Sequence, residues 1–423
     1  MIFELPDFYD KNIIFVGKGK EWSSFEKFCV TVMSPRTVKN IFISDENRDE
    51  MNTLLKNTDP ADTIIVKTAG YPGRLMPVAY TTPTRIFFDC AKQLHAKIVG
   101  VTGTKGKTTT STLLHAVLQN GGFETKLCGN MGNPMLDALE GATQNTIFVV
   151  EISSYQLAEL QQSPDVAVIT NLFKDHIDYH GNLENYWEAK RNIMRYMDAN
   201  GKVVYNPQAE IILHWLAESS ATGIAIDPNE SVDMSRAKLI GDHNKQNFLL
   251  VRAVADLFGV DRATTTTTLN NFEPIRHRLQ PVKTVRGITF VDDAIGSTPE
   301  ATIAGIEALI HNRGPIGCVM LGGVDRDYDY TELVKLLNLL LIPKLVLFPD
   351  TGEKIKNMLP ENYTPEIFET RDMKSAVEWA ANNTPSGSIC LLSTAAPSTV
   401  LWTSFEEKGS IFQQAVLELP EIG

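Results

Sequence analysis

A glycine-rich stretch, Gly103-Thr104-Lys105-Gly106-Lys107-Thr108, stands between an apolar run and a helix-forming segment. Small residues in such a turn let backbone N–H groups face a phosphate, and the following helix points its positive end at the anion. Lys107 can bring an ammonium group to the outer phosphates, and the Thr108 hydroxyl can bind Mg²⁺. The spacing differs from the common P-loop, because Val101 stands where that pattern has its first glycine. We predict a nucleoside triphosphate site, the alternative being a strand-to-helix turn without a ligand.

Acidic residues and histidines follow the next apolar runs. Glu151 ends the run FVVE, which places it at the carboxyl edge of the predicted sheet, where ligands collect in open α/β sheets. Its carboxylate is a hard oxygen ligand that suits Mg²⁺. Further along, four titratable side chains lie within six residues: Asp175, His176, Asp178 and His180. The two histidines do not by themselves predict zinc, because no helix with H-E-x-x-H accompanies them.

Short apolar runs separated by helix-forming stretches must position these residues. The runs cover 12–19, 40–44 and 63–70 in a first block, 96–103, 145–154 and 166–172 in a second, and 287–294, 316–323, 344–350 and 388–394 in a third. Their lengths and β-branched content are typical of buried parallel strands, and residues 108–122 favour a helix that ends at Gly-Gly. We predict an α/β protein with three domains: Rossmann-like, P-loop ATPase-like with a mostly parallel sheet, and Rossmann-like again.

The composition limits the partners of the chain. Its 423 residues carry a formal net charge of −12, which argues against a nucleic-acid or anionic membrane surface. Five cysteines without a C-x-x-C pair argue against a zinc ribbon or a disulfide framework and fit a reducing compartment. The N-terminus is acidic where a signal peptide is basic, and no apolar run approaches ~20 residues. We therefore expect a cytoplasmic protein without membrane insertion.

Seven separated motifs occur in the order found in Mur ligases, and residues 95 to 415 resemble that family. The motifs are GTKGKTTT (103–110), EISSYQL (151–157), TNLFKDHIDYHG (170–181) with YWEAKRNI (186–193), GDHNKQN (241–247), RHRL (276–279), FVDDA (290–294) and LGGVDRD (321–327). Mur ligases are ATP-dependent enzymes that form amide bonds in peptidoglycan synthesis. Residues 393–412 and the total length are most similar to the branch that adds glutamate to UDP-N-acetylmuramoyl-L-alanine.

The resemblance implies ATP, two Mg²⁺ sites and a role for individual residues. The implied ATP site consists of Gly103, Thr104, Lys105, Gly106, Lys107, Thr108, Thr109, Asn244, Asn247, Arg278 and Asp293. The implied catalytic residues are Lys107, Glu151, His176, Lys190 and Arg278. The implied metal ligands are Thr108, Glu151, His176 and Lys190, the last as a carbamate formed with CO₂. Carbamylation would turn a repulsive ammonium group into an oxygen ligand for Mg²⁺.

Two further sets of residues are implied for the other substrates. The UDP-sugar would contact Gly17, Lys18, Gly19, Arg36, Asn130 and His176. The turn at 17–19 is weak evidence on its own, because Trp22 replaces the third glycine of a dinucleotide fingerprint. Glutamate would be held by Ser297, Arg326, Ser398 and Phe405. The resemblance further implies a monomer with a UDP-sugar domain at 1–94, an ATP-binding ligase domain at 95–283 and an amino-acid domain at 284–423.

The glutamate site departs from the family pattern. Ala294-Ile295 replaces a Ser-Lys pair, Ser297 stands in place of a threonine, and Arg326 stands in place of a lysine. Arg326 can still bind a carboxylate bidentately, so an acidic amino acid is expected. Because the pocket is rebuilt, D-glutamate is the main prediction and L-glutamate the alternative.

The implied reaction passes through an acyl phosphate, formed when the muramoyl-L-alanine carboxylate attacks the γ-phosphate of ATP. His176 is a candidate base for the glutamate amine, and domain closure would exclude water from the reactive intermediate. Alternatives are another Mur ligase, a ligase similar to folylpolyglutamate synthase, which lacks a separate N-terminal domain, and a non-catalytic ATP-binding module. The last is disfavoured, because Lys107, Glu151 and Lys190 are all present.

Overall fold

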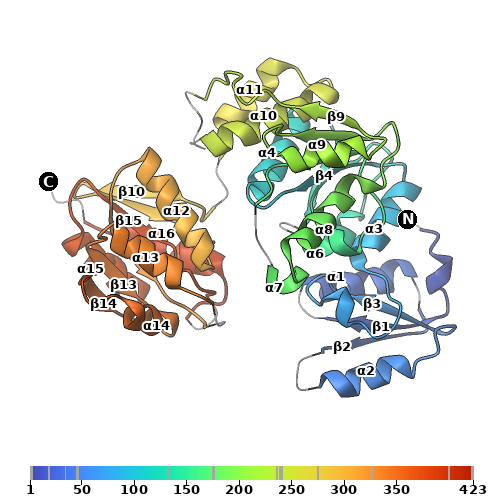
Figure 1. The fold of residues 1–423 in the computed structure, drawn as a ribbon, viewed down its shortest axis with the longest axis horizontal. Coiled ribbons are helices and arrows are strands. Elements are labelled where there is room, and N and C mark those ends of the chain that lie inside the picture. The colour runs from blue at the N-terminus through green and yellow to red at the C-terminus, as the bar shows by residue number, and fades with distance from the viewer. Residues whose placement is uncertain are drawn as a thin grey trace. The chain divides into compact units, whose positions relative to one another are not determined.

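The structure is a computed structural model that divides into two compact units (Figure 1). It describes residues 3–17, 20–33, 35–43, 47–130, 133–173, 177–234, 237, 242–273, 276–325, 328–398 and 401–420. The first unit comprises Met1–Lys238 with Asp242–Phe272, and the second comprises Leu239–Gly241 with Glu273–Gly423. The domain boundaries after residues 94 and 283 stay predictions, since the first unit holds two sheets in one compact body.

The first sheet is parallel and has the strand order β2-β1-β3. Its strands are β1 (Asn12–Val16), β2 (Thr37–Ile41) and β3 (Thr63–Lys67), and its main helices are α1 (Lys20–Phe28), α2 (Arg48–Lys56) and α3 (Pro83–Gln93). Three short helical segments accompany them: η1 (Pro6–Phe8), η2 (Cys29–Met33) and η3 (Gly73–Leu75). The strands predicted within 12–19 and 63–70 are confirmed. The one predicted at 40–44 is wrong at its start, because the exposed edge strand β2 begins at Thr37 with polar residues.

The second sheet of the first unit is parallel, with the order β5-β6-β4-β7-β8-β9. Its strands are β4 (Lys97–Thr102), β5 (Thr125–Gly129), β6 (Ile147–Glu151), β7 (Val166–Ile169), β8 (Lys202–Tyr205) and β9 (Thr222–Ala225). Its helices are α4 (Lys107–Asn120), α5 (Met135–Ala138), α6 (Ser154–Glu159), α7 (Ile177–His180), α8 (Leu183–Arg195), α9 (Glu210–Ala217), α10 (Asp242–Leu257) and α11 (Arg262–Asn271). The predicted central strands and the helix α4 ending at Gly121 are confirmed.

The second unit holds a sheet with the order β10-β11-β15-β12-β13-β14, in which only the β10–β11 pair is antiparallel. Its strands are β10 (Gln280–Val285), β11 (Ile288–Asp292), β12 (Ile316–Leu321), β13 (Lys344–Leu347), β14 (Glu366–Glu369) and β15 (Ile389–Leu392). Its helices are α12 (Pro299–Asn312), α13 (Thr331–Leu339), α14 (Thr351–Met358), α15 (Met373–Asn383) and α16 (Phe405–Leu417). The predicted α/β class with mostly parallel sheets is therefore confirmed.

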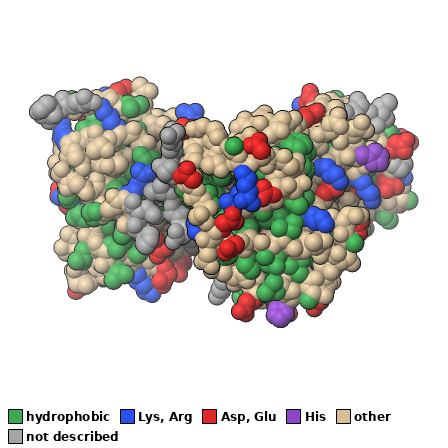
Figure 2. Space-filling model, turned by 90° about the horizontal axis from the view of Figure 1, so that it is seen from above, with side chains coloured by type: hydrophobic (Ala, Val, Ile, Leu, Met, Phe, Trp, Pro, Cys, Tyr) green, Lys and Arg blue, Asp and Glu red, His purple; other side chains and the backbone are tan. Residues whose placement is uncertain are grey.

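Neither the charge pattern of the surface nor the state of the cysteines indicates a particular function. On the face drawn in Figure 2, acidic and basic side chains lie close to one another. The five cysteines are buried free thiols. Within the described ranges, no helix has both the length and the apolar character needed to cross a membrane.

One hydrophobic core joins the two sheets of the first unit. It runs from Phe15 and Val66, which belong to the first sheet, to Phe148 of the second. Phe87 of α3 lies between them, fully buried, with its ring 5.0 Å from that of Phe148 in an edge-to-face arrangement. Because a single cluster of buried side chains serves both sheets, we expect them to unfold together.

Replacing Phe87 with alanine should lower the free energy of unfolding of the first unit by about 3–5 kcal/mol, since it removes buried area and leaves a cavity. Hydrogen exchange followed by mass spectrometry should show β1 and β6 losing protection together. The matched control is Val30→Ala at an 80% exposed position, which should change stability by less than about 0.5 kcal/mol. Loss of protection in β1 alone would show that the two sheets do not share one cooperative core.

Candidate functional site

The loop between β4 and α4 is shaped by two glycines in conformations that other residues rarely adopt. Gly103 has φ +146°, and a Cβ there would come within 1.9 Å of the Thr170 hydroxyl oxygen. Gly106 has φ +83° and precedes α4, and its Cβ would come within 2.8 Å of the Asn247 side-chain oxygen. The loop is therefore packed closely between the end of β7 and α10, and neither glycine can carry a side chain without displacing a neighbour.

The backbone of this loop is fixed by the segment that follows β7. The Thr104 amide donates to the Asn171 carbonyl (2.8 Å), and the Lys105 amide donates to the Asn171 side-chain oxygen (2.8 Å). The Thr170 hydroxyl donates to the Lys105 carbonyl (2.6 Å). The motifs GTKGKTTT and TNLF, distant in sequence, thus form one hydrogen-bonded structure beside the first turn of α4, whose N–H groups favour an anion.

Two lysines meet at the carbonyl of Gly103. The ammonium nitrogen of Lys107 lies 3.0 Å from this oxygen and 2.9 Å from the Thr104 carbonyl. The ammonium of Lys190, a side chain only 1% exposed, donates to the same Gly103 oxygen at 2.8 Å. Since both lie within 3.0 Å of one oxygen, the two nitrogens are less than about 6 Å apart, where like charges in a buried site repel. An anion bound there, or an anionic form of one lysine, would relieve this repulsion.

Glu151 ends β6 at the same edge of the sheet. It pairs in register with Val101 of β4 and Gly129 of β5, and its side chain is 1% exposed. One carboxylate oxygen accepts a hydrogen bond from the Asn130 side-chain amide at 2.9 Å. The other is buried and has no hydrogen-bond partner among the described residues. A buried carboxylate oxygen without a donor is costly, and it fits a hard divalent cation such as Mg²⁺.

Two asparagines predicted for adenine lie on α10, which packs against α4. Asn244 and Asn247 are buried, and the side-chain amide of Asn247 donates to the Asn244 side-chain oxygen at 3.3 Å. Because Asn247 also contacts Gly106, the structure brings this pair to the phosphate loop.

The structure separates two residues predicted for the UDP-sugar. Gly17 follows β1, with φ +143°, so it lies at the carboxyl edge of the first sheet. Arg36 precedes β2 and pairs with Asp62 (2.8 Å) and Asp10 (3.2 Å), and the pairing of Asn12 with Thr37 puts it at the amino edge. Because β1 and β2 are parallel, these edges are opposite, and the placement of Arg36 in one site with Gly17 is a wrong prediction.

Asn130 follows β5 and donates a hydrogen bond to Glu151, so it lies beside this candidate metal ligand. Four predicted residues lie outside the described ranges: Lys18, Gly19, His176 and Arg326. Within those ranges, no three His, Cys, Asp or Glu side chains converge in a way that could hold a metal ion.

In the second unit, Asp293 follows β11 and is buried. It accepts hydrogen bonds from the Ser393 hydroxyl (2.7 Å) and the Leu279 amide (3.2 Å). Burial raises the pKa of Asp293 to about 7, although the Ser393 hydrogen bond and the nearby charge of Arg278 both act to lower it. The structure thus brings RHRL and FVDDA together through the hydrogen bond from the Leu279 amide to Asp293.

Loops after three parallel strands of this unit are hydrogen-bonded to one another. The Ala395 amide donates to the Gly296 carbonyl (3.1 Å), and the Val324 amide donates to the Pro397 carbonyl (3.0 Å). Ser297 and the buried Ser398 lie on these loops, and Phe405 begins α16. The residues predicted for glutamate therefore cluster at the carboxyl edge of this sheet, so far as they are described.

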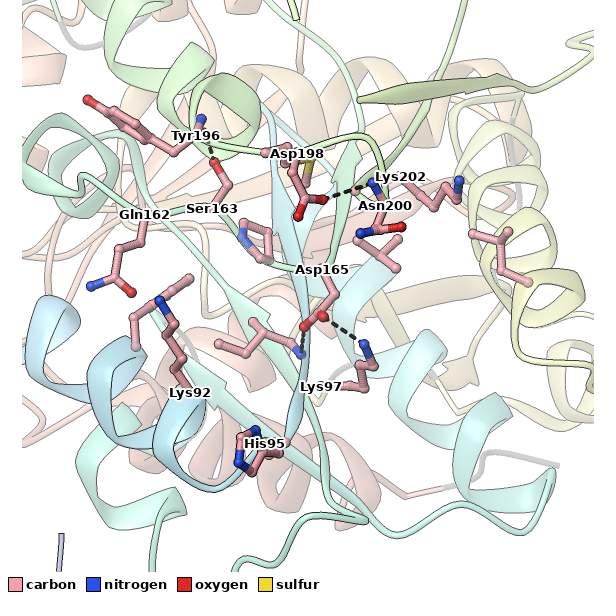
Figure 3. A pocket seen from close by; sticks show the side chains of 18 of the residues that line it. Lys92, His95, Lys97, Gln162, Ser163, Asp165, Tyr196, Asp198, Asn200 and Lys202 are labelled. Atoms are coloured by element: carbon pink, nitrogen blue, oxygen red, sulfur yellow. Dashed lines mark hydrogen bonds and ion pairs between the residues drawn. The ribbon is translucent and has the colours of Figure 1, made fainter. Parts of the chain in front are cut away.

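A cavity of about 1030 Å³ opens at the opposite, amino edge of the central sheet (Figure 3). It is lined by the starts of β4, β7 and β8 and by none of the predicted site residues. Lys97 in its wall pairs with Asp165 at 2.9 Å. Lys92, also in its wall, stands in the last turn of α3, where it complements the partial negative charge of the helix carboxyl end. Lys107, Glu151 and Lys190 lie instead at the carboxyl edge of this sheet.

Comparison with known proteins shows the family to which the chain belongs. The model of the Mur ligase middle domain matches residues 101–256. The chain is 32% identical over 345 residues to UDP-N-acetylmuramoylalanine--D-glutamate ligase of Streptococcus pneumoniae serotype 19F (strain G54), with 77% of this chain and 75% of that protein covered. The chain belongs to the Mur ligase family. The protein of the same name from Ligilactobacillus salivarius (strain UCC118) is 29% identical, with 97% of both chains covered.

Solved Mur ligases share the fold. The MurF ligase of Thermotoga maritima in complex with ADP has a TM-score of 0.61 at 17% identity, with 99% of this chain and 98% of that one covered. UDP-N-acetylmuramate-alanine ligase MurC of Thermotoga maritima has a TM-score of 0.60 at 20% identity, with 95% and 98% covered. The resemblance and the three-domain Mur ligase architecture inferred from the motifs are thereby confirmed.

One residue of this Mur ligase site escaped the sequence analysis. Tyr186 is fully buried, its ring lies 4.8 Å from the Lys190 ammonium, and its hydroxyl is 3.0 Å from that of Thr104. It thus joins the predicted carbamate lysine to the phosphate loop. The available signal was its position four residues before Lys190 on a predicted helix, which puts both side chains on one face.

The raised pKa of Asp293 makes stability depend on pH. A carboxyl group with a higher pKa in the folded protein stabilises the fold while protonated, so its contribution is complete below about pH 4 and is lost as the pH rises to about 7. Between these limits the wild type should lose about 1.4 kcal/mol per pH unit relative to Asp293→Asn. Urea unfolding of both proteins at pH 5, 6 and 7 measures this, and parallel pH profiles would contradict a raised Asp293 pKa.

Proposed function

We propose that this Mur ligase adds D-glutamate to UDP-N-acetylmuramoyl-L-alanine at the expense of ATP. The observation that carries the proposal is the meeting of Lys107 and Lys190 at the Gly103 carbonyl. The same strand edge holds a Glu151 oxygen that has no hydrogen-bond partner among the described residues. Such a site suits the phosphates of a nucleotide together with a divalent cation. The names of the relatives that match most of the chain support this amino acid and this UDP-sugar.

ATP would lie along the loop Gly103–Thr109, with its phosphates at the first turn of α4 and its adenine near Asn244 and Asn247. Mg²⁺ would be held by Thr108 and Glu151, with a second ion at His176 and Lys190. When bound, Mg²⁺ would neutralise charge on the transferring phosphate. The buried Glu151 oxygen, which lacks a hydrogen-bond partner among the described residues, and the position of Thr108 in the first turn of α4 support the first of these sites.

Lys190 is proposed to react with CO₂ to form a carbamate. An N–C bond forms between its neutral amine and CO₂, a proton leaves, and the ammonium is replaced by an anion that can bind Mg²⁺. The change would turn the repulsion between Lys190 and Lys107 into attraction. Burial of Lys190 and its contact with the Tyr186 ring support this assignment, because they fix the side chain in place.

The reaction would proceed in two steps. A carboxylate oxygen of muramoyl-L-alanine attacks the γ-phosphorus in line, ADP leaves, and an acyl phosphate forms. The neutral amine of glutamate then attacks the acyl carbon, loses a proton, and phosphate leaves as the amide forms. Lys107 and Arg278 would stabilise the charge that develops on the phosphate, so positioning and electrostatics supply most of the rate enhancement.

The remaining contacts of the proposed substrates follow the position of each loop. Gly17, with the neighbouring Lys18 and Gly19, would face the diphosphate, and Asn130 would face the muramoyl group. In the second unit, Asp293 would bind the ribose of ATP. Glutamate would lie at the carboxyl edge of the same sheet, where Ser297, Arg326, Ser398 and Phe405 belong.

The proposal is tested by ADP release from the purified chain with ATP, Mg²⁺, UDP-N-acetylmuramoyl-L-alanine and either enantiomer of glutamate. We expect turnover with D-glutamate and at most about 1% of that rate with L-glutamate. Omission of the UDP-sugar is the control for plain ATP hydrolysis. Turnover with L-glutamate alone would assign the opposite stereochemistry to the rebuilt pocket, and no turnover with either would reject the glutamate assignment.

Carbamylation is tested by comparing Lys190→Arg with the wild type. Arginine keeps the positive charge but cannot form the carbamate, so we expect ligase activity to fall at least about 100-fold. In ¹³C NMR with ¹³C-labelled bicarbonate, the wild type should show a protein carbamate signal that the variant lacks. Lys92→Arg, at an exposed position outside the proposed site, is the matched control for exchanging a lysine for an arginine. A wild type without the signal would remove the carbamate from the mechanism.

A further inference from the structure

Lys67 is a fully buried lysine at the carboxyl end of β3, and none of the motifs drew attention to it. Its ammonium donates to the carbonyls of Thr68 (3.1 Å) and Tyr71 (2.7 Å) and lies 5.3 Å from the centre of the Tyr80 ring. Long charged side chains are rarely buried unless they are paired. The side chain therefore holds the next four residues of the chain to the end of the strand.

The partner of Lys67 lies on a helix that follows a strand of the other sheet of the unit. A carboxylate oxygen of Glu159, on α6, is 3.6 Å from the Lys67 ammonium. The other oxygen accepts a hydrogen bond from the Tyr80 hydroxyl, and the Glu159 carbonyl accepts one from Arg85. Burial lowers the pKa of Lys67, while the charge of Glu159 acts in the opposite direction and favours the ammonium form. This network ties α6, which begins three residues beyond Glu151, to the first sheet.

The segment held by Lys67 reaches toward the predicted diphosphate turn at one end. Thr68 lies so close to Gly17 that a Cβ on this glycine would come within 2.2 Å of the Thr68 methyl carbon. The Glu21 carboxylate, in the first turn of α1, accepts hydrogen bonds from the Thr68 hydroxyl and from the Ala69 amide. The turn after β1 and the segment after β3 are thus held together.

At its other end the same segment holds α7. The Tyr179 hydroxyl donates to the Ala69 carbonyl at 2.9 Å, and Arg74 donates to the Tyr179 carbonyl. The Tyr179 ring stacks on Tyr155 of α6 at 3.9 Å. Tyr179 stands three residues after His176 in the sequence. Segment 68–74 therefore connects the two stretches of chain that carry the proposed UDP-sugar contacts.

We propose that Lys67, through the carbonyls of Thr68 and Tyr71, is a positioning residue for the UDP-sugar: it holds segment 68–74 so that the turn at Gly17 and helix α7 form one site. This inference rests on the proposed function and deepens it. The competing explanation is that Lys67 and Glu159 are a structural ion pair that matters for folding alone.

The two explanations differ in what a double replacement restores. Removing one partner of a buried ion pair leaves an uncompensated charge, whereas replacing both by neutral residues often restores stability. A glutamine in place of Glu159 can still accept the Tyr80 hydrogen bond, but a methionine in place of Lys67 cannot donate to Thr68 or Tyr71. The double variant should thus recover the stability of the unit without recovering the position of segment 68–74.

The experiment compares Lys67→Met, Glu159→Gln and the double variant that combines these two substitutions with the wild type. The apparent Tm and the KM values for UDP-N-acetylmuramoyl-L-alanine and ATP are measured with the full chain. Lys97→Met is the matched control, because it removes a lysine that pairs with Asp165 at the opposite edge of the central sheet.

We expect the single variants to have lowered Tm values and the double variant to recover most of the loss. The KM for the UDP-sugar should be raised about tenfold in both variants that carry the Lys67→Met substitution, with the KM for ATP within about twofold of the wild type. A double variant that regains both stability and the wild-type KM would overturn the positioning role. A wild type without ADP release would instead reject the proposed function, and this inference with it.

Discussion

The approach of two lysine ammonium groups, one buried and one half-buried, to a single carbonyl is the constraint on which the rest of the site depends. Lys107 and Lys190 approach the Gly103 carbonyl from α4 and α8. The backbone can adopt the conformation that places this carbonyl between them because residue 103 is a glycine. Positive charge gathered at one point favours the binding of an anion there. Under the proposed function, a bound phosphate and a carbamate on Lys190 would each reduce the repulsion between the two lysines, whereas a metal ion would offset the negative charge of Glu151.

The parallel sheet makes this concentration of charge possible. Strands β4, β6 and β7 all run in the same direction. The residues at or just after their ends therefore meet at one edge of the sheet, although they are far apart in sequence: Thr102, Glu151 and Thr170. The antiparallel pair β10–β11 of the second unit serves another purpose. It brings Leu279 to Asp293 and places the RHRL motif against the end of β11. Direction of strands, more than any single contact, decides which motifs meet.

The class of fold and the principal strands could be predicted from the sequence, because apolar strands and glycine turns are local patterns. The residues predicted for phosphate and metal lie at one sheet edge where they are described, and their roles stay predictions. Prediction failed where the pattern is weak or the contact is distant. Strand β2 is an exposed edge strand with polar residues, so apolar periodicity misplaced its start. Arg36 was assigned from the resemblance to the family, whereas its position follows from the pairing of β1 with β2. Tyr186 and Lys67 gain their importance from partners that are distant in sequence.

Three buried lysines show how differently the same side chain is used. Lys67 faces Glu159 and lies over Tyr80, so its charge is matched within the first unit. Lys408 of the second unit donates to Thr394 at 2.5 Å, and burial lowers its pKa to about 8 against the opposing influence of Asp292 and Asp293. Lys190 donates to the carbonyl of Gly103, and the Lys107 ammonium lies 3.0 Å from the same oxygen. Of these three buried lysines, Lys190 is the one whose ammonium contacts the glycine-rich loop, and this placement is the reason for proposing that it takes part in chemistry.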